Sequence, residues 1–217
     1  MPQAYCVGNG NLLVNFDGHL HMRDIYYPYV GLENHSAFGK VHRIGVWIEG
    51  EFSWLYDDGW TVKVDYETDT LVSLGIAENK LLGVGLDFTD FVYTSHDILF
   101  RTINVHNLAN HDREIRLFFA HDFYLYGEKM QDTAQYEPDL KAILHYRQRR
   151  YFLVNGRWED NDKAMSEFSV GKSGYHDKEG TWKDAEDGHL HGNTIEQGSV
   201  DSVAGFYESF GPNQVRK

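Results

Sequence analysis

Cysteine is nearly absent from this chain of 217 residues. Cys6 is the only one, so no disulfide within the chain can stabilise the fold. Long apolar runs are missing as well, and no stretch reaches the length of about eighteen residues that a membrane-spanning helix needs. The opening residues, Met1–Cys6, lack the basic head and the apolar segment of a secretory signal. We therefore expect a soluble protein with no membrane partner, either cytoplasmic or exported by a signal that this sequence does not contain.

Positive charge is scarce. The formal net charge is −13, from 33 acidic and 20 basic side chains. A protein that binds nucleic acid needs clustered Lys and Arg to displace the counterions of the phosphates. The one dense basic cluster here, Arg147–Arg150, falls at an expected hairpin tip. Nucleic acid is therefore excluded as a partner, and the acidic surface suits a neutral ligand such as a sugar at least as well as a charged one.

Signatures of several enzyme classes are also missing. No Gly-x-Ser-x-Gly occurs, and Gly8–Asn11 lacks the Lys and the following helix of a phosphate loop. Paired carboxylates, which catalyse glycoside hydrolysis, occur at Asp57–Asp58, at Asp87 with Asp90, and at Glu186–Asp187. Neighbouring carboxylates usually lie on turns and point apart. We interpret these pairs as solvated turns and predict no catalytic residue in this chain.

Histidine is abundant, and two pairs have the spacing of metal ligands. His19 and His21, like His189 and His191, stand two residues apart and would share one face of a strand. A metal site needs three or four ligands, and nothing in the sequence connects the two pairs. We expect no metal and no cofactor, with a metal-dependent jelly-roll enzyme as an alternative.

The dominant pattern is an alternation of apolar and polar residues, which is typical of half-buried strands. It recurs over residues 62–66, 72–76, 82–88, 103–105 and 115–119. Turn signals separate such runs, among them Asp17-Gly18, Glu49-Gly50 and Gln148-Arg149. Residues 1–217 are therefore predicted to form a single all-β domain, a large antiparallel two-sheet β-sandwich. One or two short helices are expected late in the chain, over Asp160–Val170 and Thr181–Asp187.

The segment Arg23–His35 is unusual because it combines three tyrosines and a proline with several charged groups. Exposed tyrosine supplies contact area with a polar tip, which suits a protein interface or the stacking of a sugar ring. The alternative is a covering loop whose tyrosines cap the core. We favour the interface over the two other interpretations.

Several motifs resemble prokaryotic glucoamylase-type enzymes of glycoside hydrolase family 15. They are Gly8–Phe16, Arg23–Gly31 with Glu33-Asn34-His35, Phe118–Leu125 with Asp132-Thr133-Ala134, Arg150–Gly156, Gly180–Gly188, Gly192-Asn193 and Gln197–Ser202. The resemblance follows nearly the whole chain in order. It implies an antiparallel β-supersandwich, followed in the family by a linker and an (α/α)6 barrel. That barrel carries the pair of catalytic glutamates, which hydrolyse terminal α-glucosidic bonds with inversion of configuration.

No barrel follows in this sequence, so no catalytic residue of the family can be assigned to it. The resemblance implies a non-catalytic N-terminal companion domain of a hydrolase, which packs on the barrel and stabilises it. The chain alone is then no enzyme, whereas the parent protein is an inverting α-glucan or α-glucoside hydrolase. A free-standing carbohydrate-binding module is a further alternative, which an exposed row of Trp or Tyr on one sheet would favour.

The resemblance also suggests which residues meet the barrel. We predict that the interface contains Tyr26, Tyr27, Tyr29, Glu33 and His35, with Asp184, Glu186 and Asp187 nearby. We further predict that the chain is truncated before the linker, so that its last sheet is incomplete. An edge left unpaired in this way would lead to self-association or to a frayed C-terminus.

Overall fold

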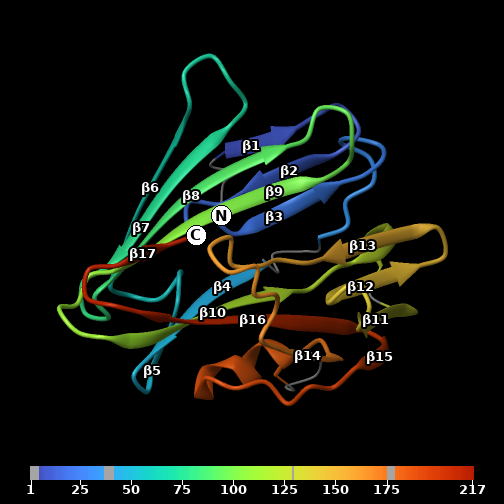
Figure 1. Ribbon diagram of the computed structural model, residues 1–217. Coiled ribbons are helices and arrows are strands. Elements are labelled where there is room, and N and C mark those ends of the chain that lie inside the picture. Colours follow the sequence, from blue (N-terminus) through green and yellow to red (C-terminus); the bar gives the residue numbers. More distant parts are fainter. Residues whose placement is uncertain (1–4, 37–41, 129, 175–178) are drawn as a thin grey trace.

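The computed structural model describes residues 5–36, 42–128, 130–174 and 179–217. Within these ranges the chain forms four antiparallel sheets and two short 3₁₀ helices, η1 (Leu125–Gly127) and η2 (Thr181–Asp187) (Figure 1).

The smallest sheet contains β1 (Tyr5–Gly8), β2 (Leu13–Phe16) and β3 (Met22–Tyr26). The first five-stranded sheet, in the order β14-β16-β10-β4-β5, contains β14 (Glu167–Lys172), β16 (Val200–Phe210), β10 (Arg113–His121), β4 (Arg43–Ile48) and β5 (Glu51–Trp54). The four-stranded sheet, in the order β13-β12-β11-β15, contains β13 (Arg150–Val154), β12 (Ala142–Arg147), β11 (Asp132–Glu137) and β15 (Ile195–Gly198). The second five-stranded sheet, in the order β17-β9-β8-β7-β6, contains β17 (Val215–Arg216), β9 (Leu99–Asn107), β8 (Val84–Val92), β7 (Ser73–Asn79) and β6 (Trp60–Tyr66).

The main hydrophobic core takes side chains from all four sheets. Phe16 of β2, Phe88 of β8, Ile115 of β10 and Ile143 of β12 belong to one buried cluster. The alternation of apolar and polar residues along the strands places these side chains in the core, because successive side chains of a strand point to opposite faces. Strand β8 is the clearest case, with buried and half-buried residues alternating along its whole length.

A second, smaller core lies on the opposite face of β10, beneath η2. Phe118 packs there with Trp54 of β5, Ala185 of η2 and Tyr207 of β16. Gly188 ends η2 with a positive φ of 88°, and a side chain at this position would collide with the indole of Trp47. Strand β10 is thus buried on both faces, which explains why its run Leu117–Phe119 breaks the alternation.

The prediction of an antiparallel all-β chain is confirmed, and the predicted division into two sheets is replaced by four hydrogen-bonded sheets. Hairpins follow the predicted turns at Glu49-Gly50 and Gln148-Arg149. The 3₁₀ helix η2 occupies the predicted segment Thr181–Asp187. The predicted helix over Asp160–Val170 is wrong, because its last four residues belong to β14, which pairs with β16.

The end of the chain is paired. Strand β16 lies inside its sheet, between β14 and β10, and β17 pairs with the edge of β9 through Val215 and Arg216. The C-terminus is therefore not frayed, while the truncation itself stays a prediction. In the part of the chain that the structure describes, no helix has the length and apolar character to cross a membrane.

Candidate functional site

The tyrosine-rich loop after β3 is folded around a buried histidine. His35 is 0% exposed, although the sequence placed it among the interface residues. Its Nδ1 accepts a hydrogen bond of 3.2 Å from the backbone N–H of Tyr126, so its Nε2 donates the 2.6 Å bond to the carbonyl of Tyr27. Burial lowers the pKa of His35, which favours this neutral form. His35 therefore joins the loop to η1 and does not itself reach the surface.

An ion pair fixes the same loop to β13. The guanidinium of Arg150 donates two hydrogen bonds to Glu33, at 2.6 Å and 3.0 Å, and lies 5.2 Å from the centre of the Tyr126 ring. The hydrogen bond from Arg150 is the main cause that lowers the pKa of Glu33. Such a bidentate pair restricts both side chains. The loop is consequently held in one position against the four-stranded sheet.

The three tyrosines of this loop have different environments. Tyr26 and Tyr27 are half-buried, and the ring of Tyr27 meets Phe152 edge-on at 6.1 Å. Tyr29 is 60% exposed, and Leu32, close to it in sequence, is 87% exposed. The surface that the loop offers to a partner is thus formed by its tip, not by its whole length.

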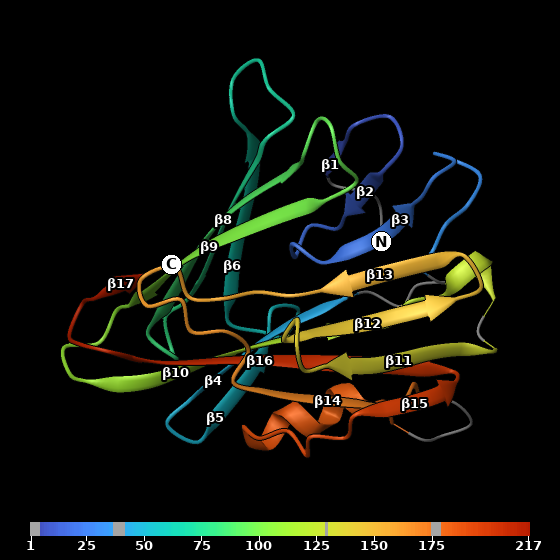
Figure 2. The same cartoon turned by 45° about the vertical axis from the view of Figure 1, so that its right-hand side comes forward.

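The second predicted group, on and after η2, lies elsewhere. Glu186 accepts a hydrogen bond of 3.1 Å from the Trp54 indole, and Asp187 accepts one of 2.9 Å from the backbone of His189. Figures 1 and 2 place the loop after β3 beside β13, whereas the coil of η2 lies below β14, beyond β10 and β16. The structure does not bring the two predicted groups together.

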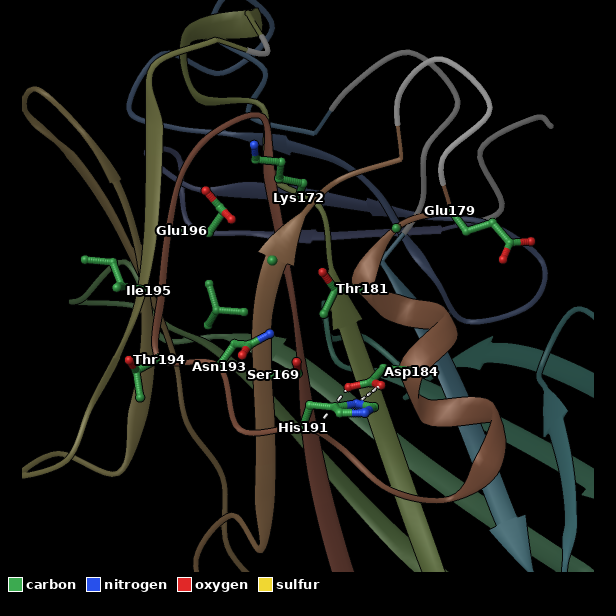
Figure 3. A pocket seen from close by; sticks show the side chains of 13 residues that line it. Ser169, Lys172, Glu179, Thr181, Asp184, His191, Asn193, Thr194, Ile195 and Glu196 are labelled. Atoms are coloured by element: carbon green, nitrogen blue, oxygen red, sulfur yellow. Dashed lines mark hydrogen bonds and ion pairs between the residues drawn. The ribbon is translucent and has the colours of Figure 1, made fainter.

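A polar groove separates η2 from β14 and β15 (Figure 3). It has a volume of about 650 Å³, and its lining side chains include Ser169, Lys172, Glu179, Thr181, Asp184, His191, Asn193, Thr194, Ile195 and Glu196. Both carboxylate oxygens of Asp184 accept from His191, one from its backbone N–H at 2.9 Å and one from its ring. This arrangement orients the Asp184 side chain, because both of its oxygens are held by one neighbouring residue. Hydroxyl, amide and carboxylate groups around an open groove suit a ligand rich in hydroxyls.

Several members of the histidine and carboxylate pairs of the sequence have structural partners. His21 is buried beside Asp17, with 3.5 Å between Nδ1 and Oδ2. Asp57 accepts a 2.7 Å hydrogen bond from the backbone of Trp54, and Asp87 and His106 are 2.7 Å apart. Among the described residues no group of three or more His, Cys, Asp or Glu side chains is arranged to hold a metal ion.

Three further histidines lie in the interior. The Nδ1 atoms of His42 and His121 are 2.9 Å apart, so one donates to the other, and Nε2 of His145 bonds the hydroxyl of Ser202 at 2.8 Å. Burial lowers the pKa of His42 and of His145 to about 3, and lowers that of His121 well below its ordinary value. Burial raises the pKa of nearby Asp132 to about 7. The interior thus holds neutral histidines and a carboxyl group that is easily protonated.

Comparisons with known proteins agree with this architecture. No protein-family profile matches the chain. An uncharacterized glycosyl hydrolase of Methanocaldococcus jannaschii is 26% identical over 188 residues, which cover 85% of this chain and 28% of that protein. A bacterial glucoamylase, solved in complex with acarbose, superposes with a TM-score of 0.71 at 11% identity. The match covers 99% of this chain and 34% of the glucoamylase chain.

The chain resembles part of a glycoside hydrolase. It spans about a third or less of the length of both proteins. The structural likeness concerns the fold alone. The groove of Figure 3 includes two residues that the sequence singled out, Asp184 and His191, and Asn193 from one of the resemblance motifs, together with Thr194, which no motif contains. Thr194 lies on the loop before β15, and no local pattern marks it, because the groove forms only when η2 packs beside β14.

Proposed function

We propose that this chain is a non-catalytic companion domain of a glycoside hydrolase acting on terminal α-glucosidic bonds. In this proposal it packs on a catalytic (α/α)6 barrel of the same parent enzyme and stabilises it. The observation that carries the proposal is the superposition of nearly the whole chain on one third of a bacterial glucoamylase. The sequence relationship to a glycosyl hydrolase supports it independently. In this proposal, the four sheets together correspond to the two layers of the supersandwich of glucoamylase-type enzymes.

The environment of the carboxylates favours a non-catalytic role. An inverting glycosidase needs two opposed carboxyl groups about 6.5–9.5 Å apart, with room for a water molecule. Here Asp90 is held by Arg101, Glu186 by Trp54, and Asp184 by His191. These groups already serve as acceptors that hold the fold together.

The exposed tip of the loop after β3 is the proposed contact with the barrel. Tyr29, Val30 and Leu32 are 60%, 40% and 87% exposed, and the loop beneath them is fixed by Glu33 and Arg150. A rigid segment with apolar side chains at its tip suits a permanent interface, since little ordering is needed on association. Exposed apolar groups gathered in this way also promote self-association of an isolated domain.

The double variant Tyr29→Ser with Leu32→Ser tests this contact. We expect the unmodified chain to self-associate at high concentration and the variant to sediment as a monomer, because the apolar contact area has been removed. Sedimentation velocity across a concentration series measures the difference. The matched control is Leu81→Ser, at a residue 92% exposed in the turn between β7 and β8, which should leave self-association unchanged. A loop-tip variant that associates as strongly as the unmodified chain would refute the proposed contact.

A further inference from the structure

The outward face of the four-stranded sheet forms two regular rows of side chains. Antiparallel pairing aligns Tyr151, Tyr146, Thr133 and Gln197 in one row, and Leu153, Leu144, Gln135 and Ile195 in the other. Residues directly opposite each other in a sheet share a face. The alternate positions Ala134, Ile143 and His145 are buried, whereas in the rows only Thr133 is, so the rows form the outward face.

Several side chains in these rows are open to solvent. Tyr151 is 59% exposed, Leu153 is 52% exposed and Ile195 is 60% exposed. The rings of Tyr146 and Tyr151 are nearly parallel, with centroids 5.8 Å apart and planes 15° apart. Figure 2 shows β13, β12, β11 and β15 side by side in front of β10 and β16, with no other described element lying over them. The face is therefore accessible in the chain as described.

The rows contain no charged side chain, in a protein whose formal net charge is −13 and in which 24% of residues are charged. The two rows themselves therefore offer nothing to attract or orient an ionic ligand, and the charged Glu137 lies beyond them, at the next outward position of β11. It does offer aromatic rings that combine an apolar surface with a polar tip, flanked by the amides of Gln135 and Gln197. These groups fit a sugar, whose C–H groups pack on an aromatic ring and whose hydroxyls bond to amides.

The rows end at β15, the strand that also borders the polar groove of Figure 3. Ile195 of the second row is among the groove's lining residues, but its side chain points away from the groove, whereas that of its neighbour Glu196 points toward it. Neighbouring strands are about 4.8 Å apart, so each row extends about 14 Å from β13 to β15. A ligand that stacks on Tyr151 and follows a row therefore reaches β15, across whose edge lie the polar groups of the groove. A ligand that uses both surfaces must be long enough to pass this edge, which favours an extended hydroxyl-rich chain over a compact molecule.

We infer that the outward face of β13-β12-β11-β15, together with the adjoining groove, binds a neutral glycan. The choice of a glycan among uncharged ligands rests on the proposed glycoside-hydrolase function. Tyr151 and Tyr146 supply the stacking surface, and the groove residues Asn193 and Thr194 bond hydroxyls. A glycan bound here would be held on the companion domain and not at a catalytic centre.

Affinity electrophoresis of the purified 217-residue chain tests the inference, with soluble starch or dextran cast into native gels. We expect at least one of the two polymers to retard the chain. Tyr151→Ala should need at least ten times the polymer concentration to reach the same retardation. Tyr151→Phe should be retarded like the unmodified chain, because the ring remains. Tyr93→Ala is the matched control, since Tyr93 is 45% exposed and directly follows β8, a strand of another sheet. It should migrate like the unmodified chain.

Two results would overturn the inference. The first is the absence of retardation by both polymers, or retardation that Tyr151→Ala leaves unchanged. The second is self-association that depends on Tyr151 without any retardation by glycan, which would identify the face as a protein interface. Either result leaves the companion role intact, because that role is tested by hydrolysis and by the loop-tip variant. The thermal midpoint of Tyr151→Ala should stay close to that of the unmodified chain, since an exposed residue is replaced.

Discussion

Replacing Asp90 by alanine should destabilise the fold by about 3–5 kcal/mol, the range for removing one partner of a buried ion pair. The Asp90 side chain is 1% exposed, and both its oxygens accept hydrogen bonds of 2.7 Å from Arg101. Arg101 lies 5.0 Å and 5.2 Å from the ring centres of Phe16 and Phe88, deep in the main core. Without Asp90 its guanidinium would be left buried and unpaired. Urea unfolding followed by tryptophan fluorescence measures the loss.

The same strand provides a matched control. Asp87 lies on the outward face of β8 and forms a 2.7 Å pair with His106, with both side chains partly exposed. Solvent-exposed pairs contribute about 1 kcal/mol or less, so Asp87→Ala should cost no more than that. The loss of stability in Asp90→Asn should fall between the two, because the amide keeps an acceptor for Arg101. This variant also allows the measurement if Asp90→Ala fails to fold. Equal losses for Asp87→Ala and Asp90→Ala would contradict the buried pairing.

Acidification should destabilise the protein steeply, through its neutral interior histidines. An unfolded histidine has a pKa of about 6.5, while burial lowers the pKa of His42 and of His145 to about 3 in the fold. Below the unfolded pKa the unfolded chain therefore binds more protons, and stability is lost as pH falls from there toward the folded pKa. Each of the two contributes a loss of about 2 kcal/mol at pH 5 by this linkage. His121 acts in the same direction.

Asp132 opposes this loss. Its folded pKa of about 7 lies above the unfolded value, so the folded state takes up a proton first and gains stability as pH falls from 7 toward 4. The gain is about 2–3 kcal/mol at pH 5, smaller than the combined loss from the histidines. The balance between these groups predicts a net decrease in the free energy of unfolding.

Three variants separate these contributions in urea unfolding at pH 6, 5 and 4. His145→Gln should make the decline with pH shallower by about 1.4 kcal/mol per pH unit, the value for one proton. Asp132→Asn should make it steeper by a similar amount, since the opposing group is gone. Leu81→Ser, at an exposed residue that carries no titratable group, should leave the slope unchanged. If all three variants lose stability with falling pH at the same rate as the unmodified chain, the interior groups do not titrate as described.

Much of the fold follows from local sequence patterns. Alternation along β7 and β8 and the turn residues Glu49-Gly50 predict strands and hairpins that the structure contains. The error over Asp160–Val170 has a physical reason. The run is short and polar at its start, and its strand part is stabilised by pairing with β16, a partner that local pattern does not reveal. The division into four sheets likewise depends on long-range pairing.

The candidate site was only partly predictable. A two-residue turn at Gln148-Arg149 implies that Tyr146 faces Tyr151, so this pair was readable from the hairpin alone. The burial of His35 could not be predicted, because its sequence context does not show that both ring nitrogens bond to backbone groups. The groove depends on η2 lying beside β14, a tertiary contact in which Gly171 leaves room for Thr181. Such contacts are set by packing and leave no periodic signal.

The central claim, a companion domain without catalytic machinery of its own, is tested most directly by measuring glucose release. The purified 217-residue chain is incubated with maltose, maltooligosaccharides and trehalose, beside an active glucoamylase as positive control. The account predicts no release above the buffer blank, because Asp90, Glu186 and Asp184 are held by Arg101, Trp54 and His191. Release that disappears in a single carboxylate variant, such as Asp184→Asn or Glu196→Gln, would contradict it.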